Sequence, residues 1–205
     1  MAPALYVIAD RDALAPRPVP EAVAAMADEG VRWIQLRAKG LSGAAWHDLA
    51  AACCEALAGS GVELWVDDRA DVAALFPVAG VHVGQGDLPP RAVRRVAGNE
   101  VAIGLSTHQE EQVAAADSDP EVSVVAVGPV FPTTGKARPD PVVGVPFVRW
   151  ARAATDKTLV AIGGIDAGNA AGVLAAGADA VAVLGAACRG DVRLSCRRLL
   201  GAVAR

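Results

Sequence analysis

The chain has 205 residues, of which 53% are hydrophobic, and it carries a formal net charge of −4. This composition is too apolar for a disordered chain, and the length suits one sizeable core, so we expect a single domain over residues 1–205. The nearly balanced charge offers no basic field to attract DNA, RNA or an anionic membrane. We therefore expect small-molecule substrates, with any anion held by a local site and no nucleic-acid or membrane partner.

The cysteines and the first residues indicate a reducing compartment. Four cysteines occur, with neither a CxxC pair nor a zinc-ligand spacing. The opening residues, MAPALYVIAD, lack the basic start of a secretion signal, and no apolar run reaches the roughly 20 residues of a membrane span. We expect a cytoplasmic protein, and the sequence leaves open whether it forms a homo-oligomer.

Short runs rich in Val, Ile and Leu recur eight times, and alanine-rich segments with helical spacing separate most of them. The expected strands are Leu5–Asp10, Trp33–Lys39, Glu63–Asp68, Gly80–Gln85, Ala102–Thr107, Val124–Val130, Leu159–Gly164 and Ala180–Gly185. The expected helices include Pro20–Glu29, Gly43–Ala58, Gln109–Ala116 and Ala167–Ala176. Strands that alternate with helices predict a parallel sheet. Eight such units with short loops predict a closed (β/α)₈ TIM barrel.

A doubly wound open sheet is the alternative fold. It is disfavoured because no GxGxxG motif follows the first strand, and the residues around Lys136, GPVFPTTGKA, lack the spacing and the hydroxyl of a Walker loop. In a TIM barrel, the active site lies where the strands run into the loops that follow them. Polar residues collect at these positions: Asp10, Arg11, Asp67, Asp68, Gln85, Asp87, Ser106, His108, Thr133 and Lys136. Their shared location predicts one polar site at the barrel mouth.

The second expected strand, within WIQLRAKG at residues 33–40, has an unusual polar face. Gln35, Arg37 and Lys39 share their parity with Trp33, while the other parity is wholly apolar. Charged residues are usually solvated, but the large apolar Trp33 on the same face argues against that explanation. A bound anion in the barrel mouth accounts for cations on a strand that is covered on both sides.

Two aspartates follow neighbouring strands beside these cations. Asp68 and Asp87 would repel an anion unless a hard cation lay between them and it. Mg²⁺ acts in this way, because it binds one or two carboxylates, several waters and phosphate oxygens. Either aspartate could instead cap the helix that follows its strand, and both interpretations stay open.

Glycines end the last two expected strands. Gly163 and Gly164 end the seventh, and Gly185 ends the eighth. Glycine lets backbone N–H groups approach a ligand closely, and the loops after strands seven and eight often hold a phosphate in this fold. The sequence thus predicts two anion sites. A reaction that joins two phosphorylated molecules would use both.

Seven motifs occur in order between Leu5 and about Ala187: QLRAK at 35–39, VDDR at 66–69, HVGQGD at 82–87, GLSTH at 104–108, GPVFPTTGK at 128–136, AIGGI at 161–165 and GADAVAVLGAA at 177–187. Together they resemble the thiamine phosphate synthase family. The QxRxK, HxGQxD and GPxFPT patterns are fairly specific, whereas generic barrel ancestry would explain the IGG pair alone.

The resemblance implies a TIM-barrel enzyme that joins 4-amino-2-methyl-5-hydroxymethylpyrimidine diphosphate to hydroxyethylthiazole phosphate and releases pyrophosphate and thiamine phosphate. It implies that Asp68 and Asp87 ligate Mg²⁺ on the diphosphate. The implied catalytic residues are Arg37, Ser106 and Lys136. The implied substrate-binding residues are Gln35, Arg37, Lys39, Asp67, Ser106, Thr133, Lys136, Gly164, Leu184 and Gly185. Within this set, Gln35 and the cations hold the diphosphate, and Thr133 and the glycines lie near the thiazole phosphate.

Three residues depart from the family pattern. Asp67 stands where Asn is usual, and it adds a negative charge near the diphosphate. Gly135 replaces the usual hydroxyl residue before the loop lysine and removes a hydrogen-bond donor. Gly185 stands where Ser is common, a change that a phosphate held by backbone N–H groups would tolerate.

The histidines contribute no predicted catalytic group. His82 has the opposite parity to Gln85, so we expect it to face the helix layer. His108 follows the fifth strand at the mouth, but solvation alone would explain a histidine there. His47 lies on an expected helix, and nothing in the surrounding sequence indicates a functional role for it.

Two other functions stay open. A thiazole tautomerase of the same barrel family shifts a proton within the thiazole phosphate and uses no diphosphate, so Lys39, Gln85 and the two predicted metal ligands count against it. A paralogue that binds thiamine precursors without catalysis would fit the Asp67 and Gly135 departures. A sugar-phosphate isomerase would share the IGG glycines, but not QLRAK together with GPVFPT.

Overall fold

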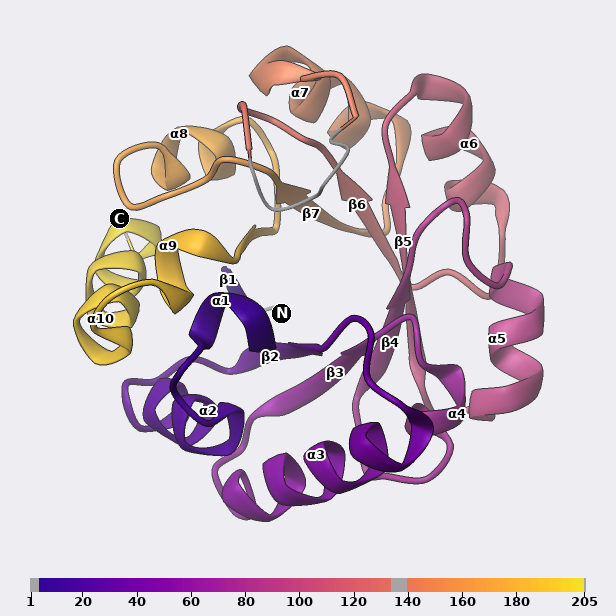
Figure 1. Cartoon of the computed structure of the whole chain (residues 1–205). Helices are drawn as coiled ribbons and strands as arrows, with labels where there is room; N and C mark the ends of the chain where they lie inside the picture. Colours follow the sequence, from indigo (N-terminus) through magenta and orange to yellow (C-terminus); the bar gives the residue numbers. More distant parts are fainter. Residues whose placement is uncertain (1–3, 134–139, 205) are drawn as a thin grey trace.

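The structure is a computed structural model that describes residues 4–133 and 140–204. Within these residues, eight parallel strands pair in chain order and β8 pairs with β1, which closes the barrel (Figure 1). The strands are β1 (Leu5–Asp10), β2 (Trp33–Arg37), β3 (Glu63–Asp67), β4 (Gly80–Val83), β5 (Ala102–Thr107), β6 (Val124–Val127), β7 (Thr158–Ile162) and β8 (Ala180–Val183). The predicted TIM barrel is confirmed.

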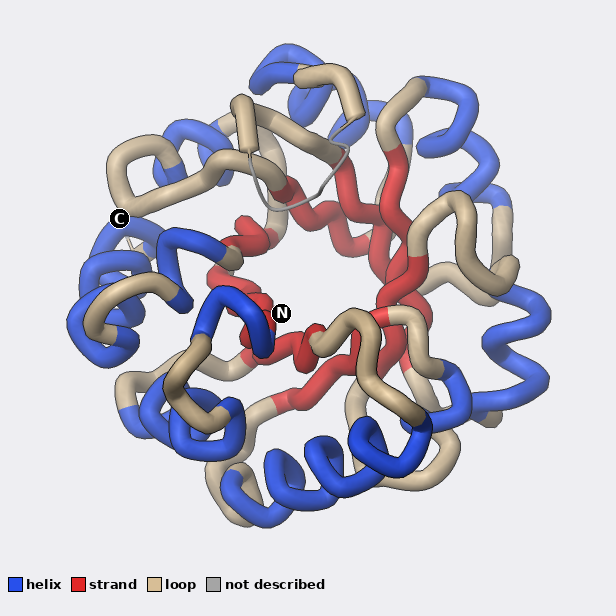
Figure 2. The backbone as a smooth tube through the Cα atoms, viewed as in Figure 1, coloured by secondary structure: helices blue, strands red, loops and turns tan. Residues whose placement is uncertain are grey.

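Helices surround the barrel on its outside (Figure 2). In the described part of the chain these are α1 (Arg11–Leu14), α2 (Val19–Asp28), α3 (Gly43–Ala56), α4 (Ala70–Ala73), α5 (Pro90–Ala97), α6 (Glu110–Ser118), α7 (Gly144–Ala154), α8 (Ala170–Ala175), α9 (Gly185–Cys188) and α10 (Val192–Val203). The four predicted helices correspond to α2, α3, α6 and α8. None of the described helices is both long enough and apolar enough to span a bilayer.

Strand side chains alternate between the helix layer and the barrel interior. On β2, Ile34 and Leu36 pack outward into the large core beneath the helices, whereas Trp33 belongs to a separate inner cluster. Gln35 shares the parity of Trp33 and is also buried. The predicted two-faced strand is therefore confirmed, and its polar face is the barrel interior.

Three aromatic rings fill the interior nearer to the strand beginnings. Tyr6, Trp33 and Trp65 pack with their ring centroids 5.3 to 5.9 Å apart. Gly80 makes room for them, because a Cβ atom at this position would lie 2.4 Å from the Trp65 ring. The same three strands carry their polar inward residues further along, so the apolar rings lie beneath a polar mouth.

Polar residues cap the N-termini of three helices. Asp10 Oδ1 accepts a hydrogen bond from the Ala13 N–H (2.8 Å) at the start of α1. Ser42 and Asp191 cap α3 and α10 in the same way. Asp68 and Asp87, for which capping was the alternative to metal binding, do not serve as the N-cap residues of α4 and α5. Those positions are taken by Arg69 and Pro89.

Candidate active site

Strand β2 delivers its polar residues into the barrel mouth. Gln35 is only 3% exposed, and its Nε2 donates a hydrogen bond to the Tyr6 hydroxyl (2.9 Å). Burial raises the pKa of Tyr6 well above its ordinary value, so this hydroxyl stays protonated. Arg37 lies one inward position further along at the end of β2, and Lys39 follows in the loop.

Arg37 and Lys39 are held by carboxylates from the neighbouring strands. Arg37 forms an ion pair with Asp10 from β1, and its Nε lies 3.6 Å from Asp67 Oδ2 on β3. Lys39 Nζ lies 2.9 Å from the same Asp67 oxygen and also pairs with Asp68. The cations predicted from the second strand thus form one cluster with three aspartates at the mouth.

Two carboxylates of this cluster, Asp67 and Asp68, have pKa values above the ordinary value of an aspartate. Burial raises the pKa of Asp67, although Lys39 and Arg37 oppose the shift. Burial and then the charge of Asp67 raise the pKa of Asp68 to about 6, against the lowering effect of Lys39. Burial opposes the charge of Lys39, but its contacts with Asp68 and Asp67 outweigh burial and raise its pKa. The raised pKa values of Asp67 and Asp68 show that their carboxylates are buried close to one another at the mouth.

Asp87 lies in the loop after β4 and adds to this crowding. Its Oδ2 accepts a hydrogen bond from the Gly84 N–H (2.9 Å), and its charge contributes to the raised pKa of both Asp67 and Asp68. Among the described residues, no group of three or more His, Cys, Asp or Glu side chains has an arrangement that could hold a metal ion. Mg²⁺ commonly binds only one or two protein carboxylates. A pair of aspartates is therefore enough to ligate it.

His82 faces the barrel interior, and the expectation that it faces the helices is wrong. Its Nε2 lies 3.0 Å from Ser106 Oγ on β5, and Gly104 provides the space, because a Cβ there would lie 2.3 Å from the His82 ring. The parity of Gln85 does not indicate the face of His82. Strand β4 ends at Val83, so Gln85 lies in a loop, where strand parity no longer applies; its Nε2 donates to the Ser106 carbonyl (2.7 Å).

His108 connects the end of β5 to the loop after β6. Its Nδ1 lies 2.5 Å from the Gly128 carbonyl oxygen, and its Nε2 lies 3.3 Å from Asp140 Oδ2. The side chain is 15% exposed and lines the cavity described below. His108 is therefore a bonded residue of the mouth rather than a solvated loop histidine.

The glycines after β7 have a packing role as well as a place at the mouth. Gly163 and Gly164 adopt φ values of +104° and +63°, which residues with a side chain rarely adopt. Cβ atoms there would lie 2.5 Å from Pro129 Cα and 2.6 Å from the Pro132 carbonyl oxygen. These glycines thus allow the loop after β6 to pack directly on the end of β7.

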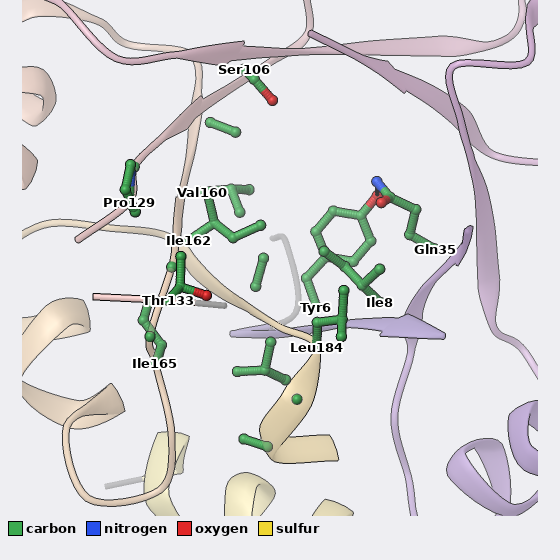
Figure 3. A pocket seen from close by; sticks show the side chains of 18 of the residues that line it. Tyr6, Ile8, Gln35, Ser106, Pro129, Thr133, Val160, Ile162, Ile165 and Leu184 are labelled. Carbon is green, nitrogen blue, oxygen red and sulfur yellow. Dashed lines mark hydrogen bonds between the residues drawn. The ribbon is translucent and has the colours of Figure 1, made fainter. Parts of the chain in front are cut away.

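A cavity of about 620 Å³ occupies the barrel mouth. Figure 3 shows the Tyr6 ring and the Gln35 amide side by side, with Thr133 and Ile165 across the cavity from them. The apolar part of the wall comes mostly from the last two strands and the residues after them, and includes Val160, Ile162, Ile165 and Leu184. The cavity thus has a polar side near β2 to β5 and a more apolar side near β7 and β8.

Most of the predicted substrate-binding residues line this one cavity. They are Gln35, Arg37, Asp67, Ser106, Thr133, Gly164, Leu184 and Gly185. Lys39, Asp68 and Asp87 are not part of its lining; Lys39 and Asp68 join it through their cluster with Asp67. Lys136 and Gly135 lie outside the described residues. The structure therefore brings together residues that are up to 150 positions apart in the chain, from Gln35 to Gly185.

Other cavity residues were not predicted from the sequence. These are chiefly Tyr6, His82, Asp166 and Arg189. Tyr6 could have been found from its parity on β1, which places it on the inward face with Ile8. No sequence pattern indicates a role for Arg189, because it follows the last motif and cannot be distinguished from an ordinary exposed arginine.

The chain is similar to known proteins over most of its length. The family model for thiamine monophosphate synthase matches residues 5–187, which include all the barrel strands of the described chain. The thiamine-phosphate synthase of Koribacter versatilis is 43% identical over 186 residues, covering 89% of this chain and 87% of that protein. The thiamine-phosphate synthase of Leptospira biflexa is 37% identical, covering 90% and 89%.

The solved structures give the same result. Thiamine phosphate pyrophosphorylase from Pyrococcus furiosus superposes with a TM-score of 0.87 at 30% identity, covering 98% of this chain and 95% of that chain. Barrels of under 20% identity, such as 3-hexulose-6-phosphate synthase, superpose less well, with a TM-score of 0.69, and share the fold alone. With the motif residues gathered around one cavity and the family match over nearly the full barrel, the chain belongs to the thiamine monophosphate synthase family.

Proposed function

We propose that the chain condenses 4-amino-2-methyl-5-hydroxymethylpyrimidine diphosphate with hydroxyethylthiazole phosphate, yielding thiamine phosphate and pyrophosphate. The proposal is carried by one observation: the motif residues from β2, β3 and β5 face those that follow β6, β7 and β8 across a single cavity. Family membership supports the same reaction. Such a cavity can hold two substrates with their reacting atoms close together.

The side near β2 to β5 suits the pyrimidine diphosphate. Arg37 and Lys39 provide positive charge, and the Gln35 amide lies deeper, beside the Tyr6 hydroxyl. Ser106 presents a hydroxyl held by His82. We assign the cations to the diphosphate, where they stabilise the charge that grows on the leaving pyrophosphate. The resemblance implies that Gln35 also holds the diphosphate, but because its amide is bonded to the buried Tyr6 hydroxyl, we assign it instead to the pyrimidine end of the same substrate. Lys136 would add a further cation from the loop after β6.

The crowded carboxylates fit a bound Mg²⁺. Asp67 Oδ2 is buried and accepts no hydrogen bond of good geometry within the described residues, although Lys39 Nζ is 2.9 Å away. A divalent cation favours oxygen donors such as Asp68 and Asp87. When bound, it would neutralise diphosphate oxygens that otherwise face these carboxylates. We assign Asp68 and Asp87 as its protein ligands, and Asp67 as a carboxylate that orients Lys39.

The other side of the cavity suits the thiazole phosphate. Ile162, Ile165 and Leu184 form an apolar surface for the thiazole ring, which places its nitrogen toward the pyrimidine and keeps water away. Thr133 provides a hydroxyl beside this surface (Figure 3). Gly164 and Gly185 bring backbone to the cavity wall, and we assign the phosphate to that region.

We place the reaction in the cytoplasm. The four cysteines are free, and three of them, Cys53, Cys188 and Cys196, are buried thiols. A chain that keeps all its cysteines reduced suits a reducing compartment.

Product formation in the presence and absence of metal tests the proposed function. The purified chain with both substrates and Mg²⁺ should form thiamine phosphate, and excess EDTA should abolish it. Asp68→Asn and Asp87→Asn should each raise the Mg²⁺ concentration needed for half-maximal rate and lower turnover, because each removes a charge while keeping size. Asp156→Asn is the matched control, since Asp156 is exposed in the loop before β7, at the opposite end of the barrel.

Each alternative makes a different prediction in this assay. A thiazole tautomerase would convert the thiazole phosphate regardless of EDTA and of both substitutions. A binding paralogue would form no product under any condition. Thiamine phosphate formation that persists in EDTA would contradict the metal assignment while leaving the condensation itself established.

A further inference from the structure

Arg189 is a cation on the cavity wall that the proposed reaction does not use. It follows α9 directly and lines the cavity together with Gly164, Leu184 and Gly185. Within the described residues, its side chain makes no hydrogen bond and no ion pair. The other arginine of the wall, Arg37, is paired with carboxylates. Arg189 therefore presents a charge that no neighbouring carboxylate of the described chain neutralises.

The single turn of α9 places Arg189 against Gly185. The two residues are four positions apart, and the Arg189 N–H donates to the Gly185 carbonyl oxygen (3.3 Å). A Cβ atom at Gly185 would lie 3.8 Å from both Cζ and Nε of Arg189. The guanidinium thus lies beside a position of the cavity wall that carries no side chain.

The charges around the cavity make such a cation useful. Asp67, Asp140 and Asp166 also line the wall, and Asp166 Oδ1 accepts a hydrogen bond from the Gly168 N–H (2.8 Å) within its own turn. A phosphate monoester that binds near Gly164 and Gly185 would contact backbone and lie near carboxylates. Arg37 lies across the barrel and is already paired with aspartates. A guanidinium can donate two parallel hydrogen bonds to phosphate oxygens.

We propose that Arg189 binds the phosphate of the thiazole substrate and makes the chain selective for the phosphorylated over the unphosphorylated thiazole. The proposal rests on the proposed function, because that function places the thiazole phosphate beside Gly185. The arginine offers a charged donor beside Gly185, which has no side chain of its own.

Arg189→Gln tests the proposal by direct binding. Calorimetric titration with hydroxyethylthiazole phosphate should show a dissociation constant raised about 10-fold, as expected for loss of a hydrogen bond to a charged group. The dissociation constant for unphosphorylated hydroxyethylthiazole should not change. Arg189→Lys should retain part of the affinity, because it keeps the charge but not the two-pronged geometry.

Arg95→Gln is the matched control. Arg95 is an exposed arginine of α5, it makes no hydrogen bond or ion pair with the described residues, and it lies outside the cavity. The control changes net charge equally and should leave binding of the thiazole phosphate unchanged. In the Arg189→Gln background, Gly185→Ser should restore part of the affinity, since the space beside Gly185 accepts a side chain without a close contact.

The binding data separate this proposal from the proposed function. An Arg189→Gln dissociation constant within twofold of the unmodified chain would overturn the role of Arg189, and so would equal weakening of the phosphorylated and unphosphorylated thiazoles. If Arg189→Gln weakens phosphate binding while the unmodified chain forms no thiamine phosphate, the arginine role stands and the condensation fails. If product forms with the same KM for thiazole phosphate in both chains, the condensation stands and the arginine role fails.

Discussion

Lys39 Nζ lies 2.9 Å from Asp67 Oδ2 and also pairs with Asp68, so one ammonium group joins two adjacent carboxylates at the cavity mouth. Asp67 in turn lies 3.6 Å from Arg37 Nε. The cations that we assign to the diphosphate are therefore held in place by the end of β3. The same carboxylates reduce the positive charge that these cations present to an anion.

Asp67→Asn should increase affinity for the pyrimidine diphosphate. It removes a negative charge near the substrate and leaves an amide of the same size to hold Lys39 and Arg37. We expect the KM for this substrate to fall about 3- to 10-fold, with the KM for thiazole phosphate unchanged. Initial rates over a range of each substrate measure both values. An increased KM would mean that the charge of Asp67 is needed to position the cations.

The dependence on Mg²⁺ should vary with pH through Asp68. Its pKa is raised to about 6 in the folded chain, so between about pH 4 and 6 the folded state binds more protons than the unfolded state. Its contribution to stability therefore falls as pH rises through that window. Mg²⁺ requires the carboxylate form, so the Mg²⁺ concentration for half-maximal rate should rise as pH falls below about 6.

The comparison with Asp68→Asn isolates this effect. The diphosphate substrate also titrates, but it does so equally for both chains. The ratio of the two half-saturating Mg²⁺ concentrations should therefore change between about pH 7.5 and pH 5, on either side of the raised pKa. A constant ratio over that range would remove Asp68 from the metal site.

Gly163→Ala should destabilise the fold. The glycine has a φ of +104°, and a Cβ would lie 2.5 Å from Pro129 Cα. Backbone strain and overpacking together should lower the free energy of unfolding by about 2–4 kcal/mol, and thermal unfolding followed by circular dichroism should show a clear drop in Tm. Gly172→Ala is the control: it lies in α8 with no atom within 4 Å of its Cβ position, and it should not lower Tm.

Lys136→Ala should reduce turnover by about 10²–10³-fold, because loss of one group that stabilises developing charge commonly costs that much. Tm should stay close to that of the unmodified chain, which separates a catalytic effect from misfolding. Steady-state rates at saturating substrates and Mg²⁺ measure the loss. Activity within a few-fold of the unmodified chain would exclude Lys136 from the site.

Gly135→Thr should lower the KM for one substrate or raise turnover. The substitution adds a hydroxyl donor at the residue before Lys136, where the resemblance to the family implies one. Kinetics and Tm that both match the unmodified chain would show that the departure is neutral.

Local sequence patterns were sufficient for the barrel and for one wall of its site. Period-two alternation placed Gln35 and Arg37 on the interior face of β2, because Trp33 and Ile34 mark the two faces unambiguously. Parallel strands bring all their carboxyl ends to one edge, so residues following different strands could be assigned to one mouth. The strand ends were less accurate. The sixth strand was expected to continue through residues 128–130, but β6 ends at Val127, where a glycine and a proline begin the loop.

The sequence by itself determined the eight βα units, the inward face of β2 and the end of the barrel where the polar residues meet, because these follow from periodicity and chain direction. Only the tertiary structure decided which side chains contact one another there. The His82 contact with Ser106, the shared Lys39 and the approach of Arg189 to Gly185 all depend on where strands end and how loops turn. These are long-range relationships, and the local pattern of residues does not contain them.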